Sequence, residues 1–362
     1  MKDAAIVLGD EFLNTPYGKT AHGLLRKSDR FRIVGVVQTG AADGDAGSLI
    51  GTPFLGIPLT GSVEAALAAA HVKPAWAIIG IATAGGKMSA PLRSLVLSAA
   101  RNGLSIVNGL HDQIVDDEEI AATIGQHGAT IIEIRKVKKP VEMSYWTGKI
   151  YDVATPRVAV LGTDCIVGKR TTACMLVSEL KERSINAELI YTGQTGWLQG
   201  ADYGFVLDAT INDFITGELE AALVACANDR NPDVMVIEGQ SSMQNPSTPC
   251  GAEIIVSGNV HGVVLQHVPG RKAFCGYGAL KNQGPSLETE IALISAYDVP
   301  LLGICLNFSE FDNGDRKSYM ADLKRRYNVP VVSPFSDGLS SVVNAIQNLI
   351  SRINGPSESA TK

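Results

Sequence analysis

The chain has 362 residues, of which 45% are hydrophobic and 6% aromatic, and it carries a formal net charge of −6. This length allows two domains of ordinary size, whereas the acidic balance excludes the basic field of a nucleic-acid-binding surface. The six cysteines lack paired spacing, which argues against a disulfide framework or a zinc site. Since no apolar run reaches the length of a membrane span, we expect a cytoplasmic protein that binds no membrane.

Short apolar runs alternate with helical patterns through the first half of the chain, as they do in parallel α/β sheets. The apolar runs predict strands at 4–8, 32–37, 75–81, 105–107 and 130–134. The helical patterns predict helices at 19–26, 62–70, 90–101 and 114–128. The alternation therefore predicts a parallel α/β domain over residues 1–137.

The alternation stops after residue 134. A basic run begins at Arg135 and ends at Pro140, and several aromatic residues follow before Pro156. We interpret residues 138–156 as the connection between two domains. Aromatic and basic residues here could line a ligand cleft, but they are more typical of a linker that packs onto its neighbours.

The second half again alternates strand and helix patterns. We expect strands at 187–191, 234–237, 262–266, 301–306 and 329–332, and helices at 211–227, 286–297, 317–327 and 340–353. These elements predict a second parallel α/β domain over residues 157–353. The final residues, 354–362, are small and polar, so we expect a disordered tail.

The most informative segment covers residues 158–172, where an apolar run leads into a glycine-bounded loop, a lysine and the start of a helix. Such a loop directs backbone N–H groups at an anion, and the lysine and the helix dipole add positive charge. The usual pattern has four residues between the glycines and a Ser or Thr directly after the lysine. Here five residues intervene, and Arg170 replaces the magnesium-binding hydroxyl. The segment predicts a phosphate site made by Gly162, Thr163, Asp164, Cys165, Gly168, Lys169, Arg170, Thr171 and Thr172.

Polar residues follow other predicted strands of the second half, at the edge where ligands bind open α/β sheets. Glu238 could bind magnesium or simply be solvated. His267 could take a proton from an amine or be structural, and Asp213 could act likewise or cap a helix. Arg271 and Lys272 could hold substrate carboxylates.

Glycine-rich loops follow strands in both halves. The loop after 187–191 contains Gln194, a candidate for substrate binding, and Trp197, which could stack on an adenine or pack internally. In the first half, residues 17–23, 83–87 and 108–111 form similar loops. These three loops would together line one edge of the sheet, so we expect the first domain to close over a ligand, although any single loop can be only a turn.

The segment from Gly162 to Lys169 resembles the phosphate loop of dethiobiotin synthetase and its relatives, and Glu238 resembles the acidic strand end of that group. Arg170 departs from their threonine. Over nearly its whole length the chain is more similar to the DUF1611 family, through residues 17–23, 108–111 and 162–172. This resemblance implies a Rossmann-like amino-terminal domain and a P-loop NTPase-like carboxy-terminal domain, both with parallel sheets.

Members of the DUF1611 family resemble a D-glutamate N-acetyltransferase, which implies acetyl transfer from acetyl-CoA in D-glutamate catabolism. The phosphates of coenzyme A would suit the loop with Lys169 and Arg170, since they are held rather than transferred. On this interpretation His267, Asp213 and Glu238 are candidates for the base, and Gln194, Arg271 and Lys272 for substrate binding, with no metal site.

Two other functions remain compatible with the sequence. The first is an ATP- and Mg²⁺-dependent ligase or kinase of the dethiobiotin synthetase type, against which Arg170 counts. The second is a non-catalytic sensor of a nucleotide or of coenzyme A. We expect small-molecule ligands and a homo-oligomer in each case, and no nucleic acid as partner.

Overall fold

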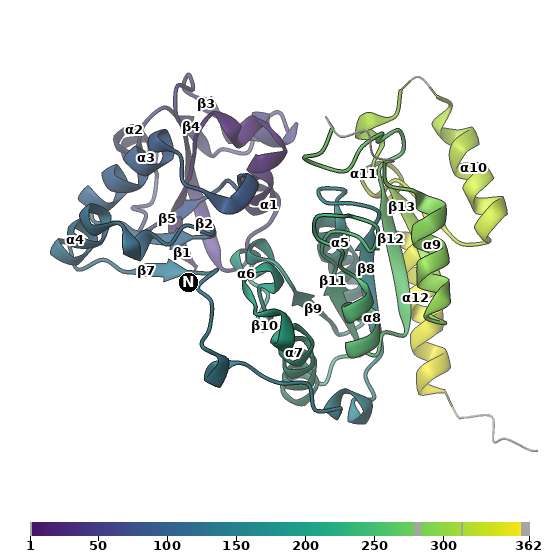
Figure 1. The fold of residues 1–362 in the computed structure, drawn as a ribbon. Coiled ribbons are helices and arrows are strands. Elements are labelled where there is room, and N and C mark those ends of the chain that lie inside the picture. The colour runs from purple at the N-terminus through teal and green to yellow at the C-terminus, as the bar shows by residue number, and fades with distance from the viewer. Residues whose placement is uncertain (1, 279–283, 313, 356–362) are drawn as a thin grey trace, which may run out of the picture. The chain divides into compact units, whose positions relative to one another are not determined.

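The structure is a computed structural model that describes residues 2–278, 284–312 and 314–355. The chain forms two compact units, each with a seven-stranded sheet (Figure 1). The first unit contains the chain up to Lys138 together with Gly193–Ala201 and Asp208–Thr210. The second contains Lys139–Thr192, Asp202–Leu207 and the chain from Ile211. The first unit thus takes two short segments from the second half of the sequence, which the predicted domain limits do not include.

The sheet of the first unit has the strand order β3-β4-β2-β1-β5-β6-β7. The strands are β1 (Asp3–Gly9), β2 (Phe31–Gln38), β3 (Gly44–Asp45), β4 (Pro58–Thr60), β5 (Trp76–Ile79), β6 (Ser105–Asn108) and β7 (Ile131–Glu133). All neighbours are parallel except β3 and β4. From β4 onward the strands follow the Rossmann order: β1, β2 and β4 extend to one side of the sheet, and β5, β6 and β7 extend to the other. The topological switch point therefore lies between β1 and β5.

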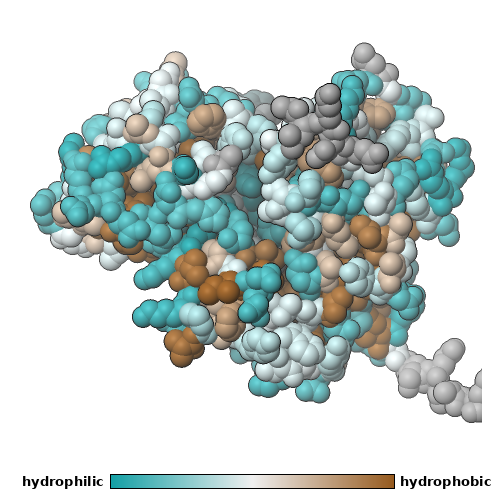
Figure 2. All heavy atoms as spheres, in the orientation of Figure 1, coloured by the Kyte–Doolittle hydropathy of each residue, from teal (hydrophilic) through white to brown (hydrophobic). Residues whose placement is uncertain are grey.

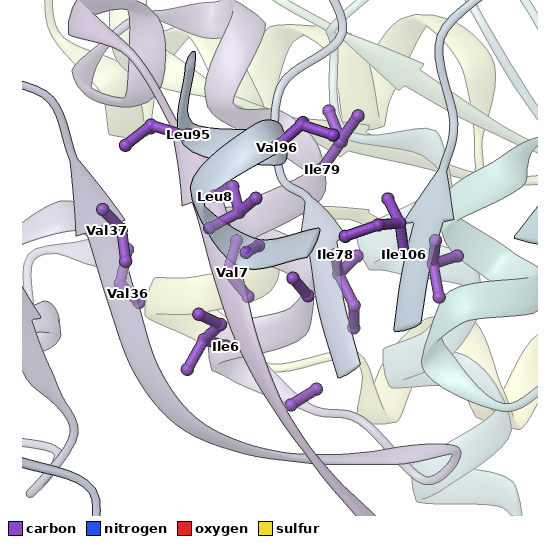
Figure 3. Close-up of a cluster of buried hydrophobic side chains, with 14 of the residues drawn as sticks. Ile6, Val7, Leu8, Val36, Val37, Ile78, Ile79, Leu95, Val96 and Ile106 are labelled. Atoms are coloured by element: carbon purple, nitrogen blue, oxygen red, sulfur yellow. The ribbon is translucent and has the colours of Figure 1, made fainter. Parts of the chain in front are cut away.

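Buried aliphatic side chains from both faces of this sheet form the core of the first unit. Figure 3 shows Ile6 and Leu8 of β1 close to Val37 of β2 and Ile78 of β5, with Val96 of the covering helix α3. The helices are α1 (Lys19–Arg26), α2 (Val63–Ala69), α3 (Ala90–Arg101), α4 (Glu118–Gln126) and α6 (Gln194–Gln199). Continuous apolar runs form these strands because parallel strands are buried on both faces.

Helix α6 belongs to the first unit through several specific contacts. Trp197 packs against two residues where β2 begins. The guanidinium carbon of Arg30 lies 4.3 Å from the centroid of the indole, and the Phe31 ring centroid is 6.5 Å away. Leu198 is fully buried in the same core. Gln199 Nε2 donates to the carbonyl oxygens of Gly23 and Lys27 at 2.9 Å. Trp197 is therefore engaged in packing.

The sheet of the second unit has the order β10-β9-β11-β8-β12-β13-β14, with every pairing parallel. The strands are β8 (Arg157–Gly162), β9 (Ala187–Tyr191), β10 (Tyr203–Gly204), β11 (Val234–Glu238), β12 (Gly262–His267), β13 (Leu301–Leu306) and β14 (Val331–Val332). β8 is central, with Glu238 of β11 opposite Val160 and Gln266 of β12 opposite Gly162. The carboxyl ends of these three strands therefore meet at one edge.

Helices cover both faces of the second sheet. They are α5 (Lys169–Glu182), α7 (Ile215–Arg230), α8 (Ala252–Ser257), α9 (Leu287–Ala296), α10 (Arg316–Tyr327), α11 (Pro334–Asp337) and α12 (Ser340–Asn354). Helix α10 buries only Leu323, and it forms a hydrophilic, teal surface at the right of Figure 2. In the part of the chain that the structure describes, no helix combines the length and apolar character needed to cross a bilayer.

Short 3₁₀ helices occur in many of the loops. They are η1 (Glu11–Asn14), η2 (Pro16–Gly18), η3 (Ala46–Ile50), η4 (Ala84–Gly86), η5 (Ile114–Asp116), η6 (Pro140–Glu142), η7 (Lys149–Asp152), η8 (Leu207–Ala209), η9 (Asn212–Phe214) and η10 (Phe308–Glu310). Two of them correct predicted helices. The helix predicted at 114–128 is divided because the Asp117 carboxylate caps α4, accepting from Ile120 N at 3.1 Å. The helix predicted at 211–227 begins as η9 and continues as α7 to Arg230.

The segment predicted as a linker packs onto the second unit. The Glu220 carboxylate of α7 accepts hydrogen bonds from Thr147 N at 2.6 Å and from Ile150 N at 3.1 Å, and Ile150 is fully buried. Of the predicted tail, residues 356–362 lie outside the described residues, and α12 extends to Asn354.

Candidate functional site: a phosphate loop at the end of β8

The loop between β8 and α5 has the backbone geometry of an anion site. Gly168 adopts a φ of +115°, which favours glycine, and it begins α5 without a side chain to cap the helix. Ile166 also has a positive φ, +54°, which is strained for a β-branched residue. The amino end of a fourteen-residue helix therefore points its N–H groups and dipole into the loop.

Lys169 places its ammonium inside this loop. Its Nζ donates to the carbonyl oxygens of Asp164 at 2.6 Å and Ser241 at 2.7 Å, and the side chain is 7% exposed. A methyl group at Gly162 would lie 3.0 Å from the Lys169 Cγ and 2.7 Å from Val167, so glycine is needed for this approach. The loop thus holds a buried cation between β8 and the segment after β11.

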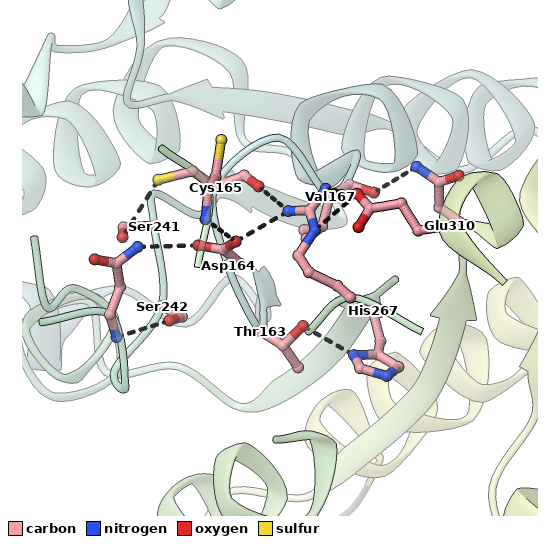
Figure 4. Close-up of polar contacts among 12 residues, drawn as sticks. Thr163, Asp164, Cys165, Val167, Ser241, Ser242, His267 and Glu310 are labelled. Atoms are coloured by element: carbon pink, nitrogen blue, oxygen red, sulfur yellow. Dashed lines mark hydrogen bonds and ion pairs between the residues drawn. The ribbon is translucent and has the colours of Figure 1, made fainter. Parts of the chain in front are cut away.

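Asp164 ties the loop to two distant segments (Figure 4). Its fully buried carboxylate accepts from Asn245 Nδ2 at 2.9 Å, from Arg271 Nη1 at 3.0 Å and from the backbone N–H of Cys275 at 2.7 Å. Three donors satisfy a charge that would otherwise be costly to bury. The carboxylate therefore fixes the conformation of the loop from the inside.

Arg271 is shared between two carboxylates. Besides Asp164 it donates to Glu310 from Nε at 3.0 Å and from Nη2 at 2.6 Å, and to the Cys165 carbonyl at 2.7 Å. Burial lowers the pKa of Arg271, but the hydrogen bonds and charges of Glu310 and Asp164 outweigh it and the net pKa is raised. The predicted role of Arg271 in binding substrate stays a prediction, and so does that of Lys272, which is exposed.

The end of β12 supports the loop from the other side. Thr163 N donates to the Gln266 carbonyl at 3.0 Å, and Thr163 Oγ1 lies 2.9 Å from His267 Nδ1. Thr172 Oγ1 donates to Gln266 Oε1 at 2.6 Å. Burial, with a smaller effect of Arg271, lowers the pKa of His267 to about 4 against the opposing charge of a glutamate on α9. The imidazole is therefore neutral at pH 7.

The end of β11 completes the site. Glu238 is buried, and its Oε2 accepts from Thr192 N at 3.2 Å. Ser241, at a φ of +36°, accepts at Oγ from Thr248 Oγ1 at 2.9 Å and from Cys165 Sγ at 3.5 Å. The carboxyl ends of β8, β11 and β12 and the segments that follow them thus bring together a lysine, a neutral histidine, a carboxylate and hydroxyl groups. These groups surround the uncapped amino end of α5.

Comparison with known proteins agrees with this geometry. The profile of a domain of unknown function, the DUF1611 P-loop domain, matches residues 144–343, and that of the DUF1611 Rossmann-like amino-terminal domain matches residues 39–137. The chain belongs to the DUF1611 family. A DUF1611 family protein from Anabaena variabilis, known from a crystal structure, has a TM-score of 0.84 and 28% identity to this chain. The match covers 96% of this chain and 100% of that protein.

Two curated relatives carry a functional name. A D-glutamate N-acetyltransferase of Pseudoalteromonas sp. is 31% identical over 74% of this chain and 79% of its own length. A protein of the same name from Tritonibacter scottomollicae is 30% identical over 74% of this chain and 80% of its own length. The predicted family and the predicted pair of Rossmann-like and P-loop folds are confirmed.

The DUF1611 site gathers most, but not all, of the residues singled out in the sequence. The loop residues, Glu238, His267 and Arg271 lie together, and Arg170 and Thr171 occupy the first turn of α5. Asp213 is exposed in η9, and Gln194 belongs to the first unit. In the described ranges, no three His, Cys, Asp or Glu residues are grouped as a metal site would require.

Sequence reasoning missed several residues of this DUF1611 site. Gln266 and Asn245 bind the loop through their side chains, and Glu310 holds Arg271. Gln266 directly precedes the singled-out His267, so its place at a strand end was a usable signal. Asn245 and Glu310 offered none, because isolated polar residues in loops are usually solvated.

Proposed function

We propose that this protein transfers the acetyl group of acetyl-CoA to the amino group of D-glutamate. The names of the two relatives at about 30% identity support the reaction class and the substrate. The loop supports the co-substrate, because an uncapped helix end and two consecutive cations, Lys169 and Arg170, suit the phosphates of coenzyme A. In this reaction the phosphates are bound and do not react.

One observation favours acetyl transfer over an ATP-dependent reaction. Phosphoryl transfer in P-loop proteins needs a hydroxyl next to the lysine to bind Mg²⁺. Arg170 occupies that position, and the Thr172 hydroxyl, two residues further on, donates to Gln266. Asp164, the acidic residue of the loop, is engaged by three donors. A site that binds phosphates through side-chain cations and the N–H groups of a helix end fits a ligand whose phosphates stay intact.

The chain's own residues then have defined tasks in acetyl transfer. The amine nitrogen attacks the thioester carbonyl, a C–N bond forms, the C–S bond breaks, and the ammonium proton must leave before attack. His267 is the first candidate for the base because its pKa of about 4 keeps the imidazole unprotonated at neutral pH. A weakly basic imidazole would pass the proton on, ultimately to the departing thiolate. Backbone N–H groups of the loop could stabilise the oxyanion.

A paired assay tests the proposal. The full chain is incubated with acetyl-CoA and either D- or L-glutamate, and thiol release is followed with a chromogenic disulfide. In parallel, phosphate release is followed from ATP with Mg²⁺. We expect thiol release that depends on D-glutamate and an N-acetylated product by mass spectrometry.

The two arms separate the alternatives. Phosphate release without thiol release would favour the ligase or kinase, and tight binding of coenzyme A with neither product would favour a sensor. Lys169→Ala serves as the control, since activity from this site must fall with loss of the loop cation. Thiol release that Lys169→Ala leaves unchanged would exclude the loop from the reaction.

A further inference from the structure

A second charged cluster lies at the carboxyl edge of the first unit's sheet, outside the phosphate loop. Arg135 follows β7 and is only 8% exposed. Its Nη2 donates to Asp208 Oδ2 at 2.6 Å and to Gln194 Oε1 at 3.0 Å. Its Nε is buried and has no hydrogen-bond partner among the residues that the structure describes. Burial lowers the pKa of Arg135, and the charge of Asp208 opposes that effect.

The cluster is assembled from separate strand ends. β6 and β7 are parallel neighbours, and Ile134 N donates to Asn108 O at 2.9 Å, so the loops that follow them begin side by side. A methyl group added at Gly109 would lie 3.1 Å from Gln194 Cγ. His111 Nε2 is 3.9 Å from Asp208 Oδ2. The cluster thus consists of His111, Arg135, Gln194 and Asp208, all in the first unit.

The hydrogen bonds of Arg135 leave one edge of its guanidinium half used. Nε and Nη2 lie on the same edge and can bind both oxygens of one carboxylate. Arg93 uses this edge fully, donating from Nε and Nη2 to the two oxygens of Asp117 at 2.6 and 2.9 Å. In Arg135, Nη2 is bonded, whereas Nε has no partner among the residues that the structure describes. A carboxylate in the correct position would engage both atoms.

The carboxylate of Asp208 is not fixed in the core as a partner of Arg135. Its side chain is 47% exposed, whereas that of Arg135 is 8% exposed. It lies on η8, a helix of three residues, in a short segment that joins the first unit only over Asp208–Thr210. An exposed carboxylate on a short element is displaced at lower cost than one fixed in a core.

We propose that His111, Arg135 and Gln194 form a binding site for the carboxylate of a small molecule, with Asp208 occupying the carboxylate position until the ligand displaces it. Two sources share this chemistry: the amino-acid substrate, in which case the inference rests on the proposed function, and a carboxylate effector. The imidazole of His111 and the amide of Gln194 add hydrogen-bonding groups beyond the guanidinium.

The test uses glutarate, a dicarboxylate without an amino group that cannot be acetylated, and the neutral glutaramide as control ligand. Titration calorimetry of the full chain should show glutarate binding and no glutaramide binding. Arg135→Gln should weaken glutarate binding on the order of 10- to 100-fold, the range for a lost charged hydrogen bond. Asp208→Asn should tighten binding about tenfold, because the competing charge is gone.

Matched controls keep the result interpretable. Asp202→Asn removes a carboxylate of similar exposure that pairs with Arg230 in the second unit, and should leave glutarate affinity unchanged. Should Arg135→Gln unfold, NMR of the unmodified protein still decides: glutarate must shift the Nε–Hε signal of Arg135 and not that of Arg93. Absence of that shift, or equal affinities of the Asp208→Asn and Asp202→Asn proteins, would overturn the site.

The source of the carboxylate is read from kinetics. Arg135→Lys should raise the KM for D-glutamate at least tenfold, with an unchanged KM for acetyl-CoA, if the site binds substrate. Glutarate binding at Arg135 in a protein without D-glutamate-dependent thiol release would keep the site and reject the proposed reaction. D-glutamate-dependent thiol release with no glutarate-induced shift at Arg135 would keep the proposed reaction and reject the site.

Discussion

The buried carboxylate of Asp164 offers the sharpest test of how the phosphate loop is held. Asp164→Ala removes the shared acceptor of Asn245 Nδ2, Arg271 Nη1 and the Cys275 N–H, at distances of 2.9, 3.0 and 2.7 Å. We expect the substitution to destabilise the second unit strongly.

The expected loss follows from what each donor retains. Breaking a buried ion pair costs about 3–5 kcal/mol, and each buried donor left unsatisfied costs about 1–3 kcal/mol. Arg271 keeps Glu310 and the Cys165 carbonyl, so its charge stays compensated. The ion-pair cost therefore does not apply, and the two other donors, Asn245 Nδ2 and the Cys275 N–H, lose their acceptor at a total of about 2–6 kcal/mol, which lowers the Tm of a domain of this size by roughly 5–20 °C.

Thermal unfolding of the full chain, followed by circular dichroism, measures this loss. Asp164→Asn keeps an acceptor oxygen and the side-chain volume, so we expect a fall in Tm of less than half that of Asp164→Ala. Asp322→Ala removes an exposed carboxylate on α10 and should change the Tm by no more than about 2 °C. If Asp164→Ala melted within that same range, the three hydrogen bonds would contribute no stability and the reasoning would be refuted.

Two further predictions concern the loop and its neighbouring histidine. Lys169→Ala should weaken coenzyme A binding on the order of 10- to 100-fold in calorimetry, because a buried charged donor is lost from the anion site. His261 and His267 have pKa values of about 4 in the fold against 6.5 in the unfolded chain. The unfolded state therefore binds more protons between these values, so Tm should be retained above pH 6.5 and fall as the pH drops toward 4, with His267→Asn reducing the fall.

Each of these has a clear contrary result. Unchanged coenzyme A affinity in a folded Lys169→Ala protein would place the phosphates elsewhere. For the histidines, the full shift from 6.5 to about 4 corresponds to about 3 kcal/mol at most for each imidazole. An identical decline of Tm with pH in the His267→Asn protein would show that His267 is not held neutral by the fold.

Local patterns in the sequence were sufficient for much of the fold. β8 and β12 each contain a continuous apolar run, and the phosphate loop is encoded within eight consecutive residues from Gly162, so both can be predicted without knowledge of distant contacts. The start of α4 could not be predicted in this way. Asp117 caps the helix by accepting from Ile120 N, and this outweighs a helical pattern that begins earlier in the sequence.

The partners of the loop could not be predicted, because they are distant in sequence. Asn245 and Cys275 lie 81 and 111 positions from Asp164, and nothing in a single sequence pairs them. Arg135 begins a basic run at the end of the first predicted domain, and nothing in that run indicates that its guanidinium is buried beside Gln194. Burial of a charged residue depends on tertiary contacts that composition does not reveal.

The placement of α6 has a consequence for dissecting the protein. The polypeptide passes from one unit to the other five times, after residues 138, 192, 201, 207 and 210. A gene split after residue 138 would yield a fragment that lacks Leu198, a fully buried member of its core, and a void of that size costs about 2–5 kcal/mol. A fragment that ends at residue 138 is therefore not the complete folding unit of the first sheet.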